Sequence, residues 1–493
     1  MSEKRYFRIF SERHTIGSEN KYVALFQQLE KCEKEEDAVL IRNLKKQGVN
    51  ADFISADKNY LYHLILKSLN DFHDSRTYNL EIKEALLSVE ILFHKGLYPE
   101  CLKLIAKAEA LAQECENFQL MIDLLMWKKK CCGYSLGLKK AAEVNRSMDH
   151  YIRLLSNLKN LTDLYYESSA LVVNNELSPE KEVKKKFTRI LSKPELASEK
   201  GALSFSALAF YHLTRANYFN SANEVEKEYK QLQKLVDMLN SSLTYALENP
   251  LDYVSIYNRL LAIKKYLPAS GFFQDLGQLK SFANKVEIRK EIVIQRVFIH
   301  ANTHELEYYL IHGKIEQALT LTKEIKKQLS KVNEGIEPYH MIYYYYLHAI
   351  ILIFSGQNHE ALRFINKTLL DFHFDDRPQV YMRVEVLSVL MHFELKNFGL
   401  VVSIARQLEK EDKKQSILIP IEYSLLAAVV RISSARHTTL KEEAQAFQSL
   451  ALELKDAKKG MHRFGNNLLE NYDKWIKAKL KRTTVLELGH FTV

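Results

Sequence analysis

One phrase recurs along this chain: a glycine turn leads into a short helix whose small and aliphatic residues are three or four positions apart. Its clearest copies are Gly96, Tyr98, Cys101, Ile105 and Ala108, then Gly313, Ile315, Ala318, Thr322 and Ile325, and then Gly356, Ala361 and Ile365. Two helices joined by such a turn form an antiparallel hairpin, and one hairpin cannot bury its apolar face alone. The phrase therefore predicts helix hairpins that stack on their neighbours.

Composition favours long helices with short connections. The 15 glycines and 8 prolines make up roughly 3% and 2% of the 493 residues, against about 7% and 5% in typical proteins. Because these residues interrupt helices and dominate the turns of strand-rich folds, their scarcity predicts an all-α chain. The length also exceeds what a single hydrophobic core organises, which indicates an elongated array.

The glycine-and-aromatic turn at Gly96 and Tyr98, followed by the small residues Cys101 and Ala108, resembles the tetratricopeptide repeat (TPR). The resemblance implies an α-solenoid, a right-handed superhelix of antiparallel helix hairpins, and it extends over about half of the chain. The interval from Gly313 to Gly356 is longer than the usual unit. The chain is therefore expected to be TPR-like but divergent.

The pattern divides the chain into five predicted segments. The first shows no periodicity and is expected to be extended or mobile, and the second is a three-helix unit. A turn at Gly48 within that unit also suits a helix-turn-helix reader of DNA. The last segment either docks on the solenoid or remains free. The segments are a mobile N-terminus (1–20), an N-terminal helical unit (21–76), divergent helical repeats (77–280), TPR-like repeats and closing helices (281–482) and a C-terminal tail (483–493).

A long amphipathic run from Val225 to Leu247 lies within the divergent repeats and predicts one helix longer than a standard repeat helix. Farther along, a glycine-turn copy at Gly356 is preceded by four consecutive tyrosines. In the family that the chain resembles, the first helix of each hairpin lines a concave groove. The resemblance therefore implies that Tyr343, Tyr346 and Ile350 lie on or near that groove, where they would bind a protein or peptide. Simple packing between repeats is the other role open to these side chains, and it is the interpretation that we favour.

Motifs for catalysis are missing from the sequence. Neither a glycine-rich phosphate loop nor a nucleophile elbow occurs, so we predict a non-enzymatic protein without cofactor or metal. His300, His304 and His312 lie on one predicted helix, where the first two share a face and could share a metal ion. Ordinary helix-surface histidines are the interpretation that we favour.

A polar cluster, Asp371 to Arg377, follows one repeat helix and precedes Pro378. Carboxylates that flank a histidine suit acid–base chemistry or a hard cation. The same residue types are equally what a helix-to-helix loop needs for its next N-cap, and this is the interpretation that we favour.

The basic residues of the chain leave nucleic acid open as a second class of partner. The net charge of +9 arises from 70 basic and 61 acidic residues, with basic stretches at 181–193 and 474–482. Such stretches can neutralise phosphates, although on a helical protein they more often form a solvated face. A helical-repeat regulator that contacts nucleic acid through its N-terminal helices or basic patches is therefore the alternative function.

Cysteine usage and hydropathy predict a cytoplasmic protein without membrane contact. The five cysteines include no CxxC pair, which favours reduced and buried thiols. The first residues lack the apolar stretch of a secretory signal, and the most apolar windows are too short to span a bilayer. The predicted function is a scaffold that holds a peptide or partner helix in its concave face, and the sequence does not indicate an oligomeric state.

Overall fold

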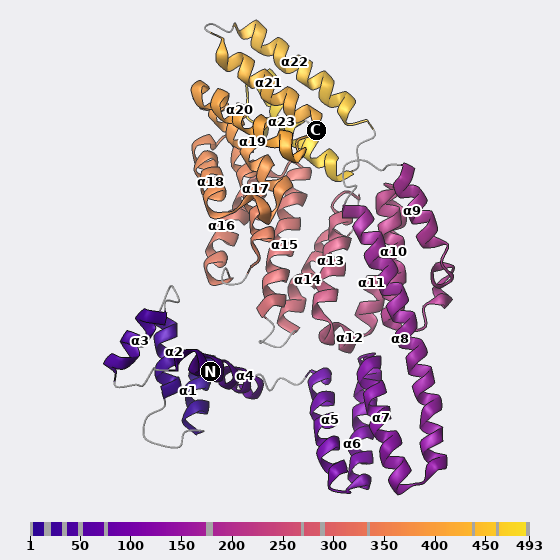
Figure 1. The fold of residues 1–493 in the computed structure, drawn as a ribbon. Helices are drawn as coiled ribbons and strands as arrows, with labels where there is room; N and C mark the ends of the chain where they lie inside the picture. Colours follow the sequence, from indigo (N-terminus) through magenta and orange to yellow (C-terminus); the bar gives the residue numbers. More distant parts are fainter. Residues whose placement is uncertain are drawn as a thin grey trace. The chain divides into compact units, whose positions relative to one another are not determined.

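The computed structural model is all-helical wherever it describes the chain (Figure 1). The described residues are 3–13, 21–31, 37–47, 53–72, 77–173, 181–267, 271–285, 291–332, 336–435, 439–459 and 463–489. They form 24 α-helices and three short 3₁₀-helices, and they contain no strand. The chain divides into two compact units, which we call unit 1 (Met1–Glu81) and unit 2 (Ile82–Val493).

Unit 1 has one helix more than the sequence predicts. Its helices are α1 (Glu3–Arg13), α2 (Lys21–Lys31), α3 (Asp37–Lys46) and α4 (Ile54–Phe72). The prediction of an extended or mobile start is wrong for residues 3–13, because α1 packs on α4 and buries Phe7 and Phe10. These aromatics lie three residues apart on one helix face, and the charged residues around them hide the period. Residues 14–20 and Gly48 lie outside the described residues.

Unit 2 is built from consecutive helices that pack as neighbouring pairs. The first helix of a hairpin also packs on the first helix of the next hairpin: α15 packs on α17, α17 on α19 and α19 on α21. This arrangement confirms an all-α helical array. The helices are α5 (Tyr78–His94), α6 (Tyr98–Glu114), α7 (Phe118–Ser135), α8 (Leu138–Val173), α9 (Lys181–Leu191), α10 (Phe205–Ser221), α11 (Val225–Ser241), α12 (Leu243–Glu248), α13 (Pro250–Lys264), α14 (Phe272–Lys285), α15 (Glu291–Ile311), α16 (Ile315–Val332), α17 (Pro338–Phe354), α18 (Asn358–Asp371), α19 (Pro378–Glu394), α20 (Phe398–Gln415), α21 (Pro420–Ser434), α22 (Leu440–Ala457), α23 (Arg463–Lys481) and α24 (Val485–Gly489).

The predicted single helix over 225–247 is wrong, because the chain leaves helical geometry at Ser242 and restarts as α12. The break turns Tyr245 into the core, where its ring lies 4.6 Å from that of Phe205 on α10. At the other end of unit 2, residues 483–489 dock on the array, since Val485 is buried and α24 packs on α17 and α23. None of the described helices is both long and apolar enough to cross a membrane.

One turn geometry closes many of the hairpins. The residue after the helix has positive φ, and the next amide donates to the carbonyl five residues back, as Leu97 N does to Leu92 O at 3.0 Å. This is the Schellman motif, in which a left-handed residue lets the chain satisfy the last helix carbonyls. Glycine fills the left-handed position in three of seven such turns among the described residues. The positive-φ residues of these turns are Gly96, Gly313, Gly356, Glu116, Asn223, Lys396 and Arg482.

Lys396→Gly is expected to raise the free energy of unfolding by about 1 kcal/mol, because glycine adopts the left-handed conformation without the Cβ clash. Lys396 is exposed and has φ 59°, so little else changes. Glu116→Gly is the matched control: the Glu116 carboxylate accepts from the amides of Phe205 and Ser206 at 2.8 and 2.7 Å. Urea unfolding should show a gain for Lys396→Gly and none for Glu116→Gly, and equal gains would contradict this account of the turns.

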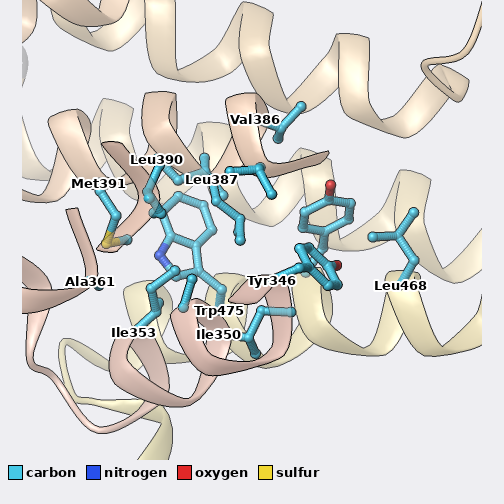
Figure 2. Close-up of a cluster of buried hydrophobic side chains, with 14 of the residues drawn as sticks. Tyr346, Ile350, Ile353, Ala361, Val386, Leu387, Leu390, Met391, Leu468 and Trp475 are labelled. Atoms are coloured by element: carbon cyan, nitrogen blue, oxygen red, sulfur yellow. The ribbon is translucent and has the colours of Figure 1, made fainter. Parts of the chain in front are cut away.

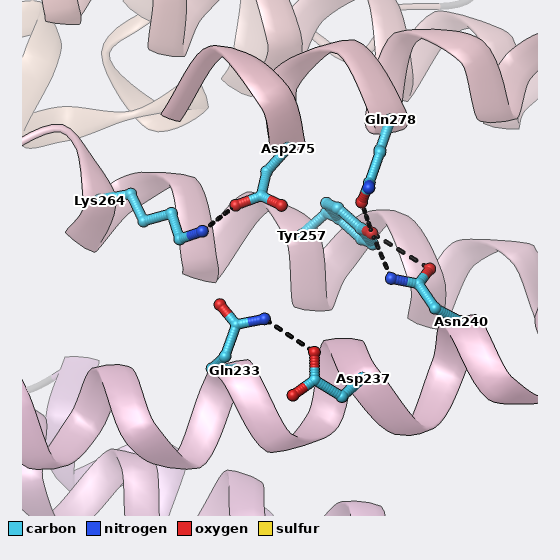
Figure 3. Close-up of polar contacts among 7 residues, drawn as sticks. All are labelled: Gln233, Asp237, Asn240, Tyr257, Lys264, Asp275 and Gln278. Atoms are coloured by element: carbon cyan, nitrogen blue, oxygen red, sulfur yellow. Dashed lines mark hydrogen bonds and ion pairs between the residues drawn. The ribbon is translucent and has the colours of Figure 1, made fainter. Parts of the chain in front are cut away.

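Polar side chains, of which Tyr257, Lys264 and Asp275 are buried, link the middle helices (Figure 3). The Tyr257 hydroxyl on α13 donates to Gln278 Oε1 on α14 at 2.7 Å and accepts from Asn240 Nδ2 on α11 at 3.1 Å. Lys264 and Asp275, both buried, form an ion pair between α13 and α14. Since buried polar groups are costly unless paired, these bonds specify how the three helices meet.

Candidate functional site

The predicted partner-binding residues all lie on α17, and the structure encloses them. Tyr346 and Ile350 are 7% and 2% exposed. Tyr343 is half-buried, and its hydroxyl donates to Glu307 Oε1 of α15 at 2.5 Å. Other parts of the chain therefore cover Tyr346 and Ile350, and their burial agrees with packing inside the array.

The covering element is α23, the penultimate helix (Figure 2). Figure 2 shows Trp475 of α23 among Ile353 of α17 and Leu390 of α19, with Leu468 near Tyr346. The lysine and aromatic side chains of α23 also hydrogen-bond to three of the first helices. Trp475 Nε1 donates to Glu394 of α19 at 2.8 Å, the Tyr472 hydroxyl to Glu422 of α21 at 2.7 Å, and Lys474 Nζ to the carbonyl of Leu310 of α15 at 2.8 Å. The first-helix face of these late repeats thus already holds a helix of the same chain.

His304 belongs to a buried polar network. Its Nε2 lies 2.7 Å from Asn258 Oδ1, and its Nδ1 lies 3.2 Å from Glu307 Oε2. Lys265 Nζ pairs with Glu307 Oε2 at 2.5 Å. Burial lowers the pKa of His304. Burial alone would raise the pKa of Glu307, but the Lys265 charge and the His304 hydrogen bond hold that pKa well below its usual range. Every member has a partner, so the network acts as a link between helices.

The other two histidines of the predicted trio have separate partners. The His300 ring lies 4.9 Å from the ring of His340, and the His312 ring stacks on Tyr308 at 4.0 Å. Within the described part of the chain, no three His, Cys, Asp or Glu side chains are grouped so that they could hold a metal ion. The structure does not bring the three histidines to one point.

The polar cluster between Asp371 and Arg377 forms a loop between two helices. The backbone amide of His373 donates to Asp376 Oδ2 at 2.8 Å, and Pro378 begins α19. The Arg377 guanidinium lies 4.3 and 4.7 Å from the ring centres of Tyr339 and Tyr343. This geometry agrees with the interpretation of the cluster as a capped helix-to-helix loop.

Glu385 on α19 is a carboxylate whose surroundings raise its pKa. It is half-buried, its Oε2 finds no hydrogen-bond donor among the described residues, and burial together with the charge of Glu411 raises its pKa to about 7. A half-buried carboxylate of this kind costs stability when it is ionised, because its oxygen has no donor among the described residues and the charge of Glu411 repels it.

Glu385→Gln is expected to stabilise the protein by about 1–2 kcal/mol at pH 8. Because the folded pKa exceeds the unfolded value near 4.5, the native state loses stability as pH rises from about 4.5 to about 7. The gain from Glu385→Gln should therefore be present at pH 8 and nearly gone at pH 5. Urea unfolding at the two pH values measures it, and a gain that does not change with pH would refute the raised pKa.

In contrast, the early hairpins of unit 2 leave a large apolar surface uncovered. Leu87 on α5, Met126 and Tyr134 on α7, and Leu138 at the start of α8 are 61%, 48%, 72% and 82% exposed. We call the face formed by these four residues, with Trp127, Lys129 and Lys130, the α5–α8 surface. Contiguous exposed apolar side chains of this size commonly mark an interaction site.

Two adjoining grooves indent the α5–α8 surface. The first, of about 340 Å³, lies between α5 and α7 and is lined by Leu86, Leu87, Glu90, Asp123, Met126, Trp127 and Lys130. The second, of about 550 Å³, lies between α7 and α8 and is lined by Met126, Lys129, Lys130, Gly133, Tyr134, Leu138, Ala141 and Met148. Met126 and Lys130 belong to both, so one bound segment can contact both grooves.

Aromatic rings gather beside the grooves. Phe93 of α5 lies 5.4 Å from the ring of Trp127 and 5.7 Å from that of Tyr134, and Tyr98 stacks on Tyr134 at 5.6 Å. Lys130 Nζ lies 4.2 Å from the Trp127 ring centre. Tryptophan and tyrosine are the residues that most often dominate binding energy at protein interfaces, and mutual packing holds these rings in place before binding.

The sequence contained a signal for this surface that its analysis missed. Met126, Lys130 and Tyr134 recur every four residues and thus form one stripe of α7, while the buried Cys131 and Cys132 lie on another face. Burial on the opposite side of α7 is what identifies the stripe as accessible.

The two basic stretches differ in their surroundings. In the C-terminal stretch, Lys474 donates to a backbone carbonyl, Lys477 pairs with Asp473 at 2.9 Å and Lys479 pairs with Glu394. In α9, Lys184, Lys185 and Arg189 are exposed, while Val183, Phe187 and Ile190 are buried beneath them. In α9 the exposed cations lie on a helix whose opposite residues are buried, whereas three lysines of the C-terminal stretch already have partners.

Comparison with known proteins adds no family: no protein-family model matches the chain, and no curated protein matches it. The geometry of the α5–α8 surface is therefore the main indication of what this chain binds.

Proposed function

We propose that this chain is a non-enzymatic, cytoplasmic protein-interaction scaffold with a divergent TPR-like, right-handed solenoid. It binds a peptide or partner helix on the α5–α8 surface. The observation that carries the proposal is the exposed row of Leu87, Met126, Tyr134 and Leu138 around two adjoining grooves. Apolar side chains left in water gain about 25 cal/mol for each Å² that a partner covers.

The late repeats of the same chain support this binding mode. There, α23 packs its apolar residues on first helices and adds hydrogen bonds at the edges, as Trp475 and Tyr472 do. A helix laid on paired helices buries a continuous apolar stripe, which is the usual helix-in-groove form of recognition. The α5–α8 surface has exposed apolar residues on the same kind of framework.

The test is photo-crosslinking from a benzoylphenylalanine placed at Tyr134, followed by mapping of the crosslinked segment in the captured protein. Leu138→Asp should abolish the crosslink, because a carboxylate in the second groove cannot be covered by an apolar side chain without loss of hydration. Leu370→Asp is the matched control, since Leu370 on α18 is also 82% exposed and lies outside the α5–α8 surface.

A crosslink to one continuous segment that disappears with Leu138→Asp and persists with Leu370→Asp supports the scaffold. Capture that is equal in both variants, or no capture at all, overturns it.

Nucleic-acid contact is the second candidate function, and the exposed basic face of α9 favours it. The exposed cations of α9 include Lys184, Lys185 and Arg189, and the helix is anchored by buried Val183, Phe187 and Ile190. Binding to mixed DNA or RNA over a salt series tests it, because each phosphate contact steepens the salt dependence. Negligible affinity at low salt would remove this function and leave the scaffold untouched.

A further inference from the structure

From the charges of the α5–α8 surface we infer that its partner is an amphipathic helix whose apolar stripe is flanked by carboxylates at one end. This inference rests on the proposed function and names the chemistry of its partner. It follows from the composition of the two groove linings and from the way in which α23 is held elsewhere in the chain.

The second groove contains positive charge and no carboxylate. Its only charged lining residues are Lys129 and Lys130, among apolar side chains such as Tyr134 and Leu138. Neither lysine has an ion-pair partner among the described residues, whereas the neighbouring Lys128 pairs with Glu109 at 2.7 Å. Two cations beside an apolar groove favour a ligand that places carboxylates next to its apolar side chains.

The first groove has the opposite balance. Glu90 and Asp123 line it, with Lys130 at the part that it shares with the second groove. A bound helix that crosses both grooves therefore meets Lys129 and Lys130 of α7 in the second groove, and Glu90 of α5 and Asp123 of α7 in the first. Its acidic residues belong at the end that lies over Lys129 and Lys130, and this polarity selects one direction of binding.

The α23 helix provides the internal comparison. It packs apolar residues on first helices while its Lys479 pairs with Glu394 and its Tyr472 and Trp475 donate to Glu422 and Glu394. There the framework supplies carboxylates and the seated helix supplies donors. On the α5–α8 surface the framework supplies Lys129 and Lys130, so the seated helix has to supply the acceptors.

Two synthetic peptides test the inference. Both are fluorescein-labelled amphipathic helices with the same leucine stripe, and the flanking positions at one end are Glu in the first and Lys in the second. At low salt we expect the Glu peptide to bind about tenfold or more tightly than the Lys peptide, with a difference that shrinks as salt screens the charges.

Charge reversal of the protein completes the design. Lys129→Glu combined with Lys130→Glu should reverse the preference between the two peptides. Lys413→Glu combined with Lys414→Glu is the matched control, because these adjacent lysines are also exposed but lie on α20. The control variant should keep the wild-type preference.

The outcomes separate the inference from the proposed function. Equal binding of both peptides, lost with Leu138→Asp, overturns the acidic partner and keeps the scaffold. Binding of neither peptide overturns the acidic partner as well, and if the Tyr134 crosslink is also missing it overturns the scaffold too. A preference that persists in the Lys129 and Lys130 double variant assigns the recognition to other residues and refutes the inference.

Discussion

Trp475→Ala is expected to lower the free energy of unfolding of the late repeats by about 3–5 kcal/mol. The indole is 4% exposed, and its ring lies 5.5 Å from that of Phe447. Truncation leaves a cavity and removes the 2.8 Å hydrogen bond to Glu394. Urea unfolding followed by circular dichroism measures the loss, which is large because the side chain closes the core between α23 and the first helices.

The other tryptophan provides the control for this experiment. Trp127 is half-buried on the α5–α8 surface, so Trp127→Ala should cost about 1 kcal/mol or less of stability and instead weaken partner binding. If Trp475→Ala left stability unchanged, α23 would not be part of the folded array in solution. The buried face of α17 would then again be a candidate for partner binding through Tyr346 and Ile350.

Lys265→Met is expected to destabilise unit 2 by about 3–5 kcal/mol, because it leaves the Glu307 carboxylate buried without its cation. The two groups lie 2.5 Å apart and are 3% and 8% exposed. The remaining contacts of Glu307, from His304 at 3.2 Å and Tyr343 at 2.5 Å, do not replace a full positive charge. Chemical unfolding at pH 7 measures the effect.

The double variant Lys265→Met with Glu307→Gln should recover most of that loss, since no unpaired charge then remains. In the parent protein the pKa of Glu307 is lowered, so the stability from this pair is present above about pH 4.5 and is lost as pH falls below it. The deficit of Lys265→Met should accordingly shrink on acidification. Strictly additive losses in the double variant would show that the two side chains are not coupled.

Local patterns predicted the helices and the glycine turns, and the structure has them where the pattern is strong. Gly96, Gly313 and Gly356 adopt the left-handed conformation that their turns require. The same turn at Glu116 was not predicted, because an L-residue can occupy the left-handed position at a cost of roughly 1 kcal/mol that other contacts offset. Helix α1 was not predicted either, because its run of periodic aromatic residues is short and has charged residues within it.

The candidate site was harder to predict than the fold. Tyr343, Tyr346 and Ile350 lie on a first helix, as their position before Gly356 indicates, but α23 covers that face. Trp127 and Tyr134 lie on an equivalent helix without such a cover among the described contacts of unit 2. Both helices carry aromatic and aliphatic residues on the face in question. The residue types alone therefore do not distinguish the covered face from the open one.

The sequence by itself determined an all-α chain of paired helices, because helical period and turn conformation depend on residues only a few positions apart. Which face is accessible was decided by the tertiary structure. The bond from Lys474 to the carbonyl of Leu310 joins residues that are 164 positions apart. Contacts over such distances depend on how the whole array stacks, and this stacking buries Tyr346 and Ile350 of α17 while the α5–α8 surface stays exposed within unit 2.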